Sequence, residues 1–224
     1  MAELNATVLI PAFNEERSIA ATVRAARRIP GVTQVIVVDD GSTDQTGDLA
    51  REAGALVLKA GKNLGKGGAL NYGLPQVRGD YLLLLDADVG TTAYEGKKLL
   101  TVVAKGQADL VIGRLPSGEK KSGFGFLLFF ARRIIRQFTG LTLSAPLSGQ
   151  RALNRKALQA LDGEFDKGFG VEVGMIIDVA RKGLVIKEIP VAMAHRQTRR
   201  DLPGFLHRGR QFLDVCATVF KRLF

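Results

Sequence analysis

The chain has 224 residues, enough for one domain of ordinary size with a substantial core. Apolar residues make up 46% and charged residues 24%, with 26 glycines and 7 prolines, so the composition excludes a disordered chain and a fibrous repeat. The formal net charge of +10 predicts an anionic partner, such as nucleic acid, an acidic lipid surface or a phosphorylated substrate.

The positive charge is concentrated in the second half of the chain. Residues 1–112 carry 12 basic and 13 acidic side chains, whereas residues 113–224 carry 20 basic and 9 acidic ones. We find no internal repeat and no low-complexity linker, so we expect a single domain with two functional halves.

Cysteine usage and the N-terminus favour a cytosolic location. The single Cys216 cannot form an internal disulfide, and no basic region precedes the short apolar run at the N-terminus. The longest uncharged apolar stretch, residues 123–131, is much shorter than the ~20 residues that span a bilayer. We therefore expect a protein that touches the cytosolic face of a membrane without crossing it.

Strand and helix patterns alternate through the first half. Short runs rich in Leu or β-branched residues predict strands at residues 6–10, 34–39, 55–59, 81–85 and 109–112. Helical patterns lie between them at residues 15–28, 43–53 and 68–76. This order predicts an α/β fold, a mainly parallel doubly wound sheet with helices on both faces and ligands at the C-terminal strand ends.

The second half begins with an amphipathic Phe/Arg segment over residues 124–138. Further helices are expected at residues 154–161, 173–182 and 204–224, and a strand at residues 185–189. The two Phe-rich segments, 123–138 and 204–224, combine aromatic bulk with Arg and Lys, a composition typical of an interfacial helix on anionic lipid. Core packing or a dimer interface would explain the same pattern, and no nucleic-acid-binding motif is visible.

A glycine-rich segment, GKNLGKGG from Gly61 to Gly68, resembles two nucleotide-binding motifs superficially. A Walker A loop needs four residues before Gly-Lys and then Ser or Thr, but three residues separate Gly61 from Gly65, and Gly67 follows Lys66. A dinucleotide fingerprint would have to follow the first strand, which ends in PAF instead. The glycines are consistent with a close backbone approach to phosphate near Lys66, or with a plain flexible loop.

The sequence Asp86-Ala87-Asp88 follows the apolar run YLLLL. With the period of two of a strand, both carboxylates face the same side, where hard oxygen ligands suit Mg²⁺ or Mn²⁺. Haloacid dehalogenase-like phosphatases also use Asp-x-Asp, but on the first strand and with a different continuation. A solvated turn at the strand end is the remaining structural explanation.

Four segments in order, PAFNEE, VVDDGSTDQT, NLGKGGALNYG and LLLLDAD, resemble the nucleotide-sugar-binding half of family 2 glycosyltransferases with the GT-A fold. Later segments, SGQRAL, GFGVEV and EIPV, resemble the dolichyl- and polyprenyl-phosphate hexosyltransferase branch. The resemblance implies one GT-A domain over residues 1–224. Residues 1–115 would bind the nucleotide sugar, and residues 116–224 the acceptor through a basic amphipathic C-terminal segment.

The resemblance also implies roles for individual residues in donor binding. A UDP- or GDP-hexose would be bound by Pro11, Ala12, Asn14, Glu15, Asp39, Asp40, Lys66, Asp86, Ala87, Gly149 and Gln150. Asp88, with Asp86, would bind the Mg²⁺ or Mn²⁺ that bridges the diphosphate. His195 is the candidate third ligand, because it resembles a metal-binding His of glucosyl-3-phosphoglycerate synthases.

Family 2 members generally invert the anomeric centre, and a hydroxyl acceptor then requires a general base. Asp166 and Glu172 are the candidates, and Asp88 and Arg151 complete the expected catalytic set. A lipid phosphate is already ionised and needs no strong base. Its charge would be held by Arg side chains, and the candidates are Arg151, Arg196, Arg199 and Arg200.

These features predict a metal-dependent, inverting hexosyltransferase that acts on a polyprenyl phosphate or another phosphate-bearing acceptor. One alternative is transfer to a soluble acceptor such as phosphoglycerate or a saccharide. Another is a catalytically silent module that binds nucleotide or anion through its basic half.

Overall fold

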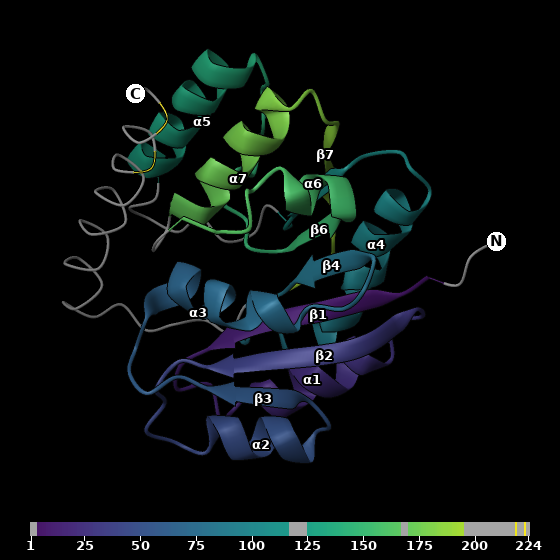
Figure 1. Cartoon of the computed structure of the whole chain (residues 1–224), viewed down its shortest axis with the longest axis vertical. Helices are drawn as coiled ribbons and strands as arrows, with labels where there is room; N and C mark the ends of the chain where they lie inside the picture. The colour runs from purple at the N-terminus through teal and green to yellow at the C-terminus, as the bar shows by residue number, and fades with distance from the viewer. Residues whose placement is uncertain (1–3, 117–124, 167–169, 195–217, 219–221, 223–224) are drawn as a thin grey trace.

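The structure is a computed structural model that describes residues 4–116, 125–166, 170–194, 218 and 222. Its centre is a seven-stranded sheet with the order β3-β2-β1-β4-β6-β5-β7 (Figure 1). The strands are β1 (Ala6–Ala12), β2 (Val32–Asp39), β3 (Leu56–Lys59), β4 (Tyr81–Leu84), β5 (Leu110–Arg114), β6 (Arg151–Asn154) and β7 (Ile186–Pro190).

Helices connect the strands and cover the sheet. The α-helices are α1 (Ile19–Arg27), α2 (Thr46–Glu52), α3 (Gly65–Gly73), α4 (Gly96–Ala104), α5 (Gly125–Thr139), α6 (Arg155–Gln159) and α7 (Gly170–Arg181). Two 3₁₀ helices, η1 (Leu74–Gln76) and η2 (Gly90–Glu95), precede β4 and α4. Helices α5 and α7 lie at the opposite end of the molecule from α2 (Figure 1).

The predicted α/β class is confirmed, and the sheet is mainly parallel. Strands β1, β2, β3 and β4 pair in parallel, as do β5 and β7. Strand β6 is antiparallel to both of its neighbours, β4 and β5. We did not predict β6, because the segment from Arg151 to Asn154 is short and carries polar residues at both ends.

Two further differences from the predicted elements concern helices. The helix predicted from residue 68 begins at Gly65, so much of the glycine-rich segment is helical. Helix α4 was not predicted, although its buried face carries Leu99, Leu100 and Val103. The helix predicted at residues 204–224 lies almost entirely outside the described residues.

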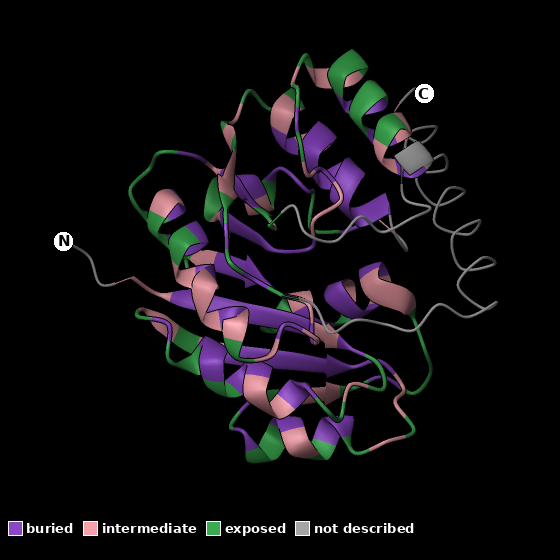
Figure 2. Ribbon diagram, turned by 180° about the vertical axis from the view of Figure 1, so that it is seen from behind, coloured by how far each residue is buried: buried purple, intermediate pink, exposed green. Residues whose placement is uncertain are grey.

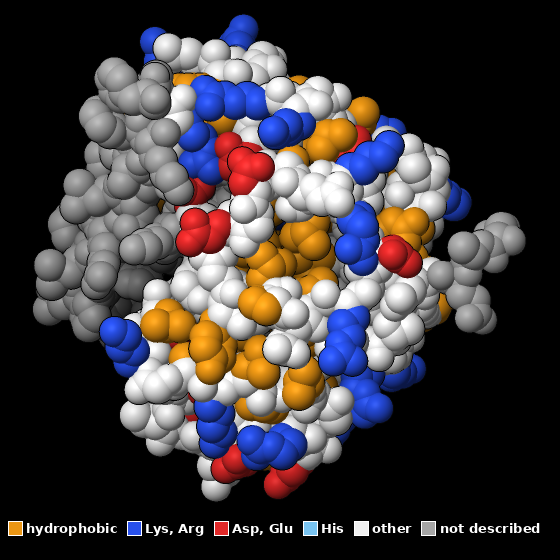
Figure 3. Space-filling view, in the orientation of Figure 1, with side chains coloured by type: hydrophobic (Ala, Val, Ile, Leu, Met, Phe, Trp, Pro, Cys, Tyr) orange, Lys and Arg blue, Asp and Glu red, His pale blue; other side chains and the backbone are white. Residues whose placement is uncertain are grey.

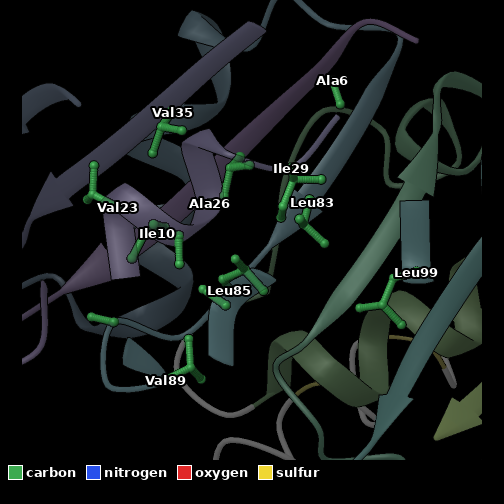
Figure 4. Packing of buried hydrophobic residues seen from close by; sticks show 14 of the residues in the cluster. Ala6, Ile10, Val23, Ala26, Ile29, Val35, Leu83, Leu85, Val89 and Leu99 are labelled. Carbon is green, nitrogen blue, oxygen red and sulfur yellow. The ribbon is translucent and has the colours of Figure 1, made fainter. Parts of the chain in front are cut away.

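The sheet separates two hydrophobic cores because neighbouring strand residues face opposite sides. Ile10 and Leu83 pack with α1 and α4 on one face (Figure 4), whereas Leu9 and Leu82 pack with α3, α5 and α7 on the other. The central strands β1, β4, β5 and β6 are buried almost throughout, whereas the edge strands β3 and β7 are partly exposed (Figure 2). Burying each such side chain contributes ~1.5–3 kcal/mol, so the two cores hold the strand ends in fixed places.

The sheet has a topological switch point between β1 and β4. From β1 the sheet extends through β2 to β3, and the chain then returns to place β4 on the other side of β1. In open α/β sheets, ligands bind outside the C-terminal strand ends at such a switch point. The segments after Ala12 and after Leu84 flank that position.

Within the described part of the chain, no helix has both the length and the apolar character needed to cross a membrane.

Candidate active site

A cluster of charged side chains lies beyond the end of β4. The ammonium Nζ of Lys66, in the first turn of α3, lies 2.8 Å from Oδ1 of Asp86 and 2.8 Å from Oε1 of Glu172 on α7. Burial disfavours the charged ammonium, but the two carboxylates outweigh this effect and raise the pKa of Lys66 above its ordinary value. Lys66 is therefore a cation at neutral pH, and it joins the turn after β4 to α7.

Gln150 fixes the second oxygen of Asp86. Its amide Nε2 donates to Oδ2 of Asp86 over 2.7 Å, and the backbone N–H of Asp86 donates to Oε1 of Gln150 over 3.2 Å. Gln150 is fully buried. Its contacts orient the Asp86 carboxylate, whereas the resemblance placed Gln150 against the nucleotide sugar.

Gly149 lies directly against this cluster. A Cβ at residue 149 would lie 2.4 Å from Nζ of Lys66 and 2.6 Å from Oδ1 of Asp86. Both distances are well below van der Waals contact, so a side chain here would displace the ion pair. The backbone at Gly149 thus closes one side of the cluster, and only glycine permits that approach.

Glu172 is the most deeply buried acidic side chain of the cluster, at 2% exposure. One of its oxygens accepts from Lys66, while the other, Oε2, is buried and has no hydrogen-bond partner within the described residues. A buried carboxylate oxygen without a partner is costly in a folded protein. Such an atom can accept a hydrogen bond or a proton from a ligand hydroxyl.

Arg151 is 1% exposed and holds the loop before β6 against α7. Its guanidinium donates to the carbonyls of Ser148 (2.9 Å), Pro146 (2.7 Å) and Glu172 (2.9 Å). Burial lowers the pKa of Arg151 to about 10, although Glu172, Glu188 and Asp86 favour its charged form. Arg151 is therefore buried next to the cluster, and its guanidinium donates mainly to backbone carbonyls.

The loops after β1 and β2 are bound to each other. The N–H of Asn14 donates to Oγ of Ser42 over 3.0 Å, and Oδ1 of Asn14 accepts the N–H of Thr43 over 2.9 Å. The N–H of Glu15 donates to Oγ1 of Thr46 over 2.7 Å. Asn14 has a φ of +54°, a left-handed conformation that Asn tolerates better than most residues.

The carboxylates of Asp39 and Asp40 accept hydrogen bonds from backbone N–H groups. Oδ1 of Asp39 accepts the N–H of Ser42 over 3.0 Å. The two oxygens of Asp40 accept the N–H groups of Leu64 (2.7 Å) and Gly65 (2.9 Å) at the start of α3. Burial raises the pKa of Asp40, an effect that these two hydrogen bonds reduce. Pro11 and Ala12, also predicted to bind the donor, are the last two residues of β1.

The Asp86-Ala87-Asp88 segment forms a turn beyond the end of β4 and is not part of the strand. The strand period therefore does not determine the directions of the two carboxylates, which corrects our geometric argument. Asp86 and Asp88 are both half-buried at the edge of the site. Among the described residues, no three His, Cys, Asp or Glu side chains form a metal-binding group.

Asp166, a candidate base, is engaged by a residue from the end of the chain. Nη2 of Arg222 lies 2.6 Å from Oδ2 of Asp166 and also contacts the Asp178 carboxylate on α7. Of the two candidate bases, Glu172 contacts Lys66, whereas Asp166 pairs with Arg222. The predicted site residues His195, Arg196, Arg199 and Arg200 lie outside the described residues.

Sequence reasoning missed two polar residues that support the site. Thr22, in the middle of α1, contacts the turn that carries Asp88. Asn71, on α3, exchanges two hydrogen bonds with the backbone of Phe165, at 2.8 and 2.6 Å. Thr22 lies outside the segments that carry the family resemblance, and Asn71 lies inside one of them, NLGKGGALNYG, but was given no role there. The spacing of the two residues in the chain gives no signal of these contacts.

The fold defines an α/β protein, and the cluster near its switch point is a candidate ligand site. Residues 7–162 match the family described as Glycosyl transferase family 2, which is more than half of the chain. The chain belongs to this family, and the resemblance found from its motifs is confirmed.

Two curated relatives are named as sugar transferases. A low-salt glycan biosynthesis hexosyltransferase of Haloferax volcanii is 34% identical over 209 residues, which cover 89% of this chain and 50% of that protein. An undecaprenyl-phosphate mannosyltransferase of Micrococcus luteus is 32% identical over 206 residues, covering 84% of this chain and 83% of that protein. The chain thus spans half the length of the first relative and most of the second.

Solved structures of glucosyl-3-phosphoglycerate synthase from Mycobacterium tuberculosis share the fold. The complex with Mn²⁺, UDP-glucose and phosphoglyceric acid has a TM-score of 0.80 and 28% identity, covering 99% of this chain and 80% of that one. A complex with Mg²⁺ and UDP has a TM-score of 0.79, also at 28% identity, covering 99% of this chain and 79% of that one. The predicted GT-A architecture is confirmed by this likeness.

Proposed function

We propose that this protein transfers a hexose from a UDP- or GDP-sugar to a polyprenyl phosphate or another phosphate-bearing acceptor. The observation that carries the proposal is the Asp86–Lys66–Glu172 cluster near the switch point of the sheet, in which Oε2 of Glu172 is buried and has no partner among the described residues. The family membership and the donor complexes of the mycobacterial synthase support the same reaction class.

The donor would lie over the ends of β1, β2 and β4. Pro11, Ala12, Asn14, Glu15 and the backbone held by Asp39 and Asp40 would form the wall for the base and ribose. Lys66, Asp86, Ala87 and Gly149 would lie nearer the diphosphate and the sugar. Both oxygens of Asp86 already accept a hydrogen bond, from Lys66 and from Gln150. We therefore assign Asp86 to the sugar or ribose hydroxyls and leave the cation to Asp88.

The carboxylates at the end of β4 fit a hard divalent cation. Asp88 would hold it, and diphosphate oxygens together with His195 would fill other positions. When bound, Mg²⁺ or Mn²⁺ would neutralise the negative charge that develops on the departing nucleoside diphosphate. Lys66 adds a fixed positive charge on the same side, which favours the same departure.

Glu172 is the group that we assign to the acceptor side. The acceptor oxygen attacks the anomeric carbon, a new C–O bond forms, and the bond to the nucleoside diphosphate breaks with inversion. For a hydroxyl acceptor, Oε2 of Glu172 takes the proton that is lost. For a phosphate acceptor no proton is lost, and Glu172 would orient the sugar by accepting a hydroxyl hydrogen bond.

Arg151 and Asp166 receive different roles in this proposal from those implied by the resemblance. The contacts of Arg151 to three backbone carbonyls support a positioning role beneath Glu172. The ion pair of Asp166 with Arg222 supports a structural role for that carboxylate. Binding of the acceptor phosphate then falls to Arg196, Arg199 and Arg200.

One face of α5 supports acceptor delivery from an anionic membrane. Phe129 is 64% exposed there and lines a hollow of about 600 Å³ together with three arginines, Arg132, Arg133 and Arg136. Lys and Arg side chains gather over this end of the molecule (Figure 3). An exposed aromatic ring edged by arginines suits peripheral contact with the headgroups of a cytosolic leaflet.

A soluble acceptor is the second candidate. The mycobacterial synthase binds phosphoglyceric acid in its complex, and this chain matches it over 99% of its length. Flotation with liposomes that contain anionic lipid distinguishes the two. Salt-sensitive binding that is lost in the triple variant Arg132→Gln/Arg133→Gln/Arg136→Gln supports the lipid acceptor, and no binding by the unaltered protein favours the soluble one.

A silent binding module is the third candidate, and the burial of Glu172 argues against it. A non-catalytic module gains nothing from a buried carboxylate oxygen, Oε2 of Glu172, that has no hydrogen-bond partner within the described residues. Calorimetry with UDP- and GDP-sugars, with and without Mn²⁺, tests donor binding directly. We expect Mn²⁺-dependent binding that Asp88→Ala weakens, and donor hydrolysis or transfer that Glu172→Gln reduces at unchanged donor affinity. Binding that is independent of Mn²⁺ and of Asp88 would contradict the proposed metal role.

A further inference from the structure

The hydroxyl of Thr22 brackets Asp88 from the interior of the protein. Thr22 lies in the middle of α1 and is fully buried. Its Oγ1 accepts the N–H of Gly90 over 2.9 Å, and its single proton has two carbonyl acceptors in reach, Ala87 at 2.8 Å and Ser18 at 3.1 Å, of which Ala87 is the nearer. The residues on both sides of Asp88 are thus bound to α1 by the same side chain.

Core packing holds the same turn in place. The side chains of Ala87 and Val89 are 5% and 2% exposed and belong to the core that contains Val23 of α1 (Figure 4). Gly90 has a φ of +54°, which lets the chain turn into η2 directly after this contact. Asp88 therefore extends from a short segment whose backbone is fixed before and after it.

From this geometry we propose that Thr22 is a positioning residue that acts through Asp88. This inference rests on the proposed function, because it concerns how precisely Asp88 presents its carboxylate to a divalent cation and a nucleoside diphosphate. A metal ligand must be placed within about 0.2 Å, and a lost outer hydrogen bond typically costs about 10- to 100-fold in metal affinity. A hydroxyl that bonds both flanks of the turn supplies that placement.

Thr7 provides a matched control within the same chain. It is also fully buried, and its Oγ1 donates to Oε1 of Gln34 over 2.9 Å and accepts the N–H of Gly79 over 3.0 Å. Thr7 lies near the start of β1, at the end of the sheet opposite Asp88. Replacing either threonine by valine keeps the shape and removes one donor and one acceptor, so the two losses of stability should be similar.

The test is calorimetry of Mn²⁺-dependent UDP or GDP binding, together with thermal unfolding, for the full chain and its variants. We expect Thr22→Val to weaken the Mn²⁺-dependent part of binding by about 10- to 100-fold. Binding of the nucleotide without metal should stay within about twofold. Thr22→Ser should restore most of the affinity, and Thr7→Val should leave it unchanged at a similar loss of melting temperature.

A double variant shows whether Thr22 acts through Asp88. On an Asp88→Asn background, Thr22→Val should cause no additional loss of metal affinity, because the group that it positions has already been removed. Faster hydrogen exchange at the Gly90 amide in Thr22→Val is expected independently of any ligand.

The outcomes separate two kinds of failure. If the unaltered protein binds nucleotide without any Mn²⁺ dependence, the proposed metal role fails and this inference fails with it. If the unaltered protein shows the dependence and Thr22→Val retains it, or if Thr7→Val loses it equally, only the positioning role of Thr22 is overturned. Should Thr22→Val not fold, Thr22→Ala and Thr22→Ser are compared in its place, and equal metal affinity in both overturns the inference.

Discussion

The carboxylates after β2 and those around β4 differ in what neutralises them. Asp39 and Asp40 accept hydrogen bonds from backbone N–H groups of the loops that they support. Asp86 and Glu172 instead share one ammonium, that of Lys66. The first arrangement uses backbone N–H groups, including those at the start of α3, whereas the second depends on side chains that come from α3, α7 and the turn after β4.

This difference indicates which acidic residues serve the structure and which serve a ligand. A carboxylate whose oxygens accept backbone N–H groups stabilises a loop and has fewer lone pairs available for a ligand. Both oxygens of Asp40 are used in this way. Glu172 retains a buried oxygen without a partner in the described part of the chain. Residues of the same chemical type thus hold loop backbone in one region and, in the proposed function, face the ligand in the other.

Removing the shared cation should have the largest effect. Lys66→Met leaves Asp86 and the buried Glu172 uncompensated, and breaking a buried ion pair in this way costs about 3–5 kcal/mol. We expect the free energy of unfolding to fall by an amount of that order and transfer activity to reach background. Chemical denaturation and a donor-turnover assay measure the two effects.

The matched control for Lys66→Met is Lys62→Met, at an exposed lysine a few residues earlier. It should leave both quantities almost unchanged. Adding Glu172→Gln to Lys66→Met should recover part of the stability without restoring activity. Equal effects of the Lys62 and Lys66 variants would contradict the separation between the two regions.

A methyl group at residue 149 should have the next largest effect. In Gly149→Ala the added Cβ would lie 2.4 Å from Nζ of Lys66, so the ion pair must move. Overpacking of this kind typically costs about 1–3 kcal/mol, and the displaced Asp86 should reduce turnover more than tenfold. Gly61→Ala is the control, because a Cβ at residue 61 would have no described heavy atom within 4 Å. Unchanged turnover in Gly149→Ala would show that the cluster tolerates displacement.

Loss of the amide contact between α3 and the acceptor half should have an intermediate effect. Asn71→Ala removes two hydrogen bonds, which leaves the N–H and the carbonyl of Phe165 without their partner. Each buried polar group that loses its hydrogen bond lowers the free energy of unfolding by about 1–3 kcal/mol. We expect lower stability and a reduced kcat at unchanged donor affinity, because Phe165 precedes Asp166 and Glu172. Gln34→Ala removes a comparable pair of contacts far from the site and should lower stability alone. A fall in donor affinity instead of kcat would contradict the assignment.

The pH dependence of stability should give the smallest effect, with opposite signs for two neighbouring carboxylates. Burial raises the pKa of Asp40 above its ordinary value of 3.8, so the folded state holds this proton to higher pH than the unfolded state. The contribution of Asp40 to stability is therefore full below that value and falls as the pH rises through the folded pKa.

Asp44 should show the reverse. Burial opposes ionisation, but hydrogen bonds from Thr46 and Glu16 outweigh it and lower the pKa of Asp44 below 3.8. Its contribution is present above pH 3.8 and is lost as the pH falls through the folded pKa. Denaturation curves of Asp40→Asn and Asp44→Asn between about pH 3 and pH 6 should differ from the unaltered protein in opposite directions. Parallel changes would contradict the distinction.

The sequence by itself determined the fold class and the family, and it predicted where the candidate site lies. Leu-rich and β-branched runs alternate with helical patterns, and polar residues such as Asp40, Lys66 and Asp86 directly follow the strands or open the helices. These signals are local, since they depend on side chains only a few residues apart. They were sufficient to predict a mainly parallel sheet, the family and a cluster at the C-terminal strand ends.

Tertiary structure alone decided how those residues are used. Strand β6 is inserted antiparallel between β4 and β5, which brings Gly149 and Gln150 onto Asp86 and buries Arg151. From the sequence, Arg151 was predicted to bind the acceptor phosphate. In the structure its side chain is buried and donates hydrogen bonds to three backbone carbonyls. The contact of Lys66 with Glu172 and the bracket that Thr22 forms around Asp88 join segments far apart in the chain. Such pairings depend on how two cores pack against one sheet, and no local pattern encodes them.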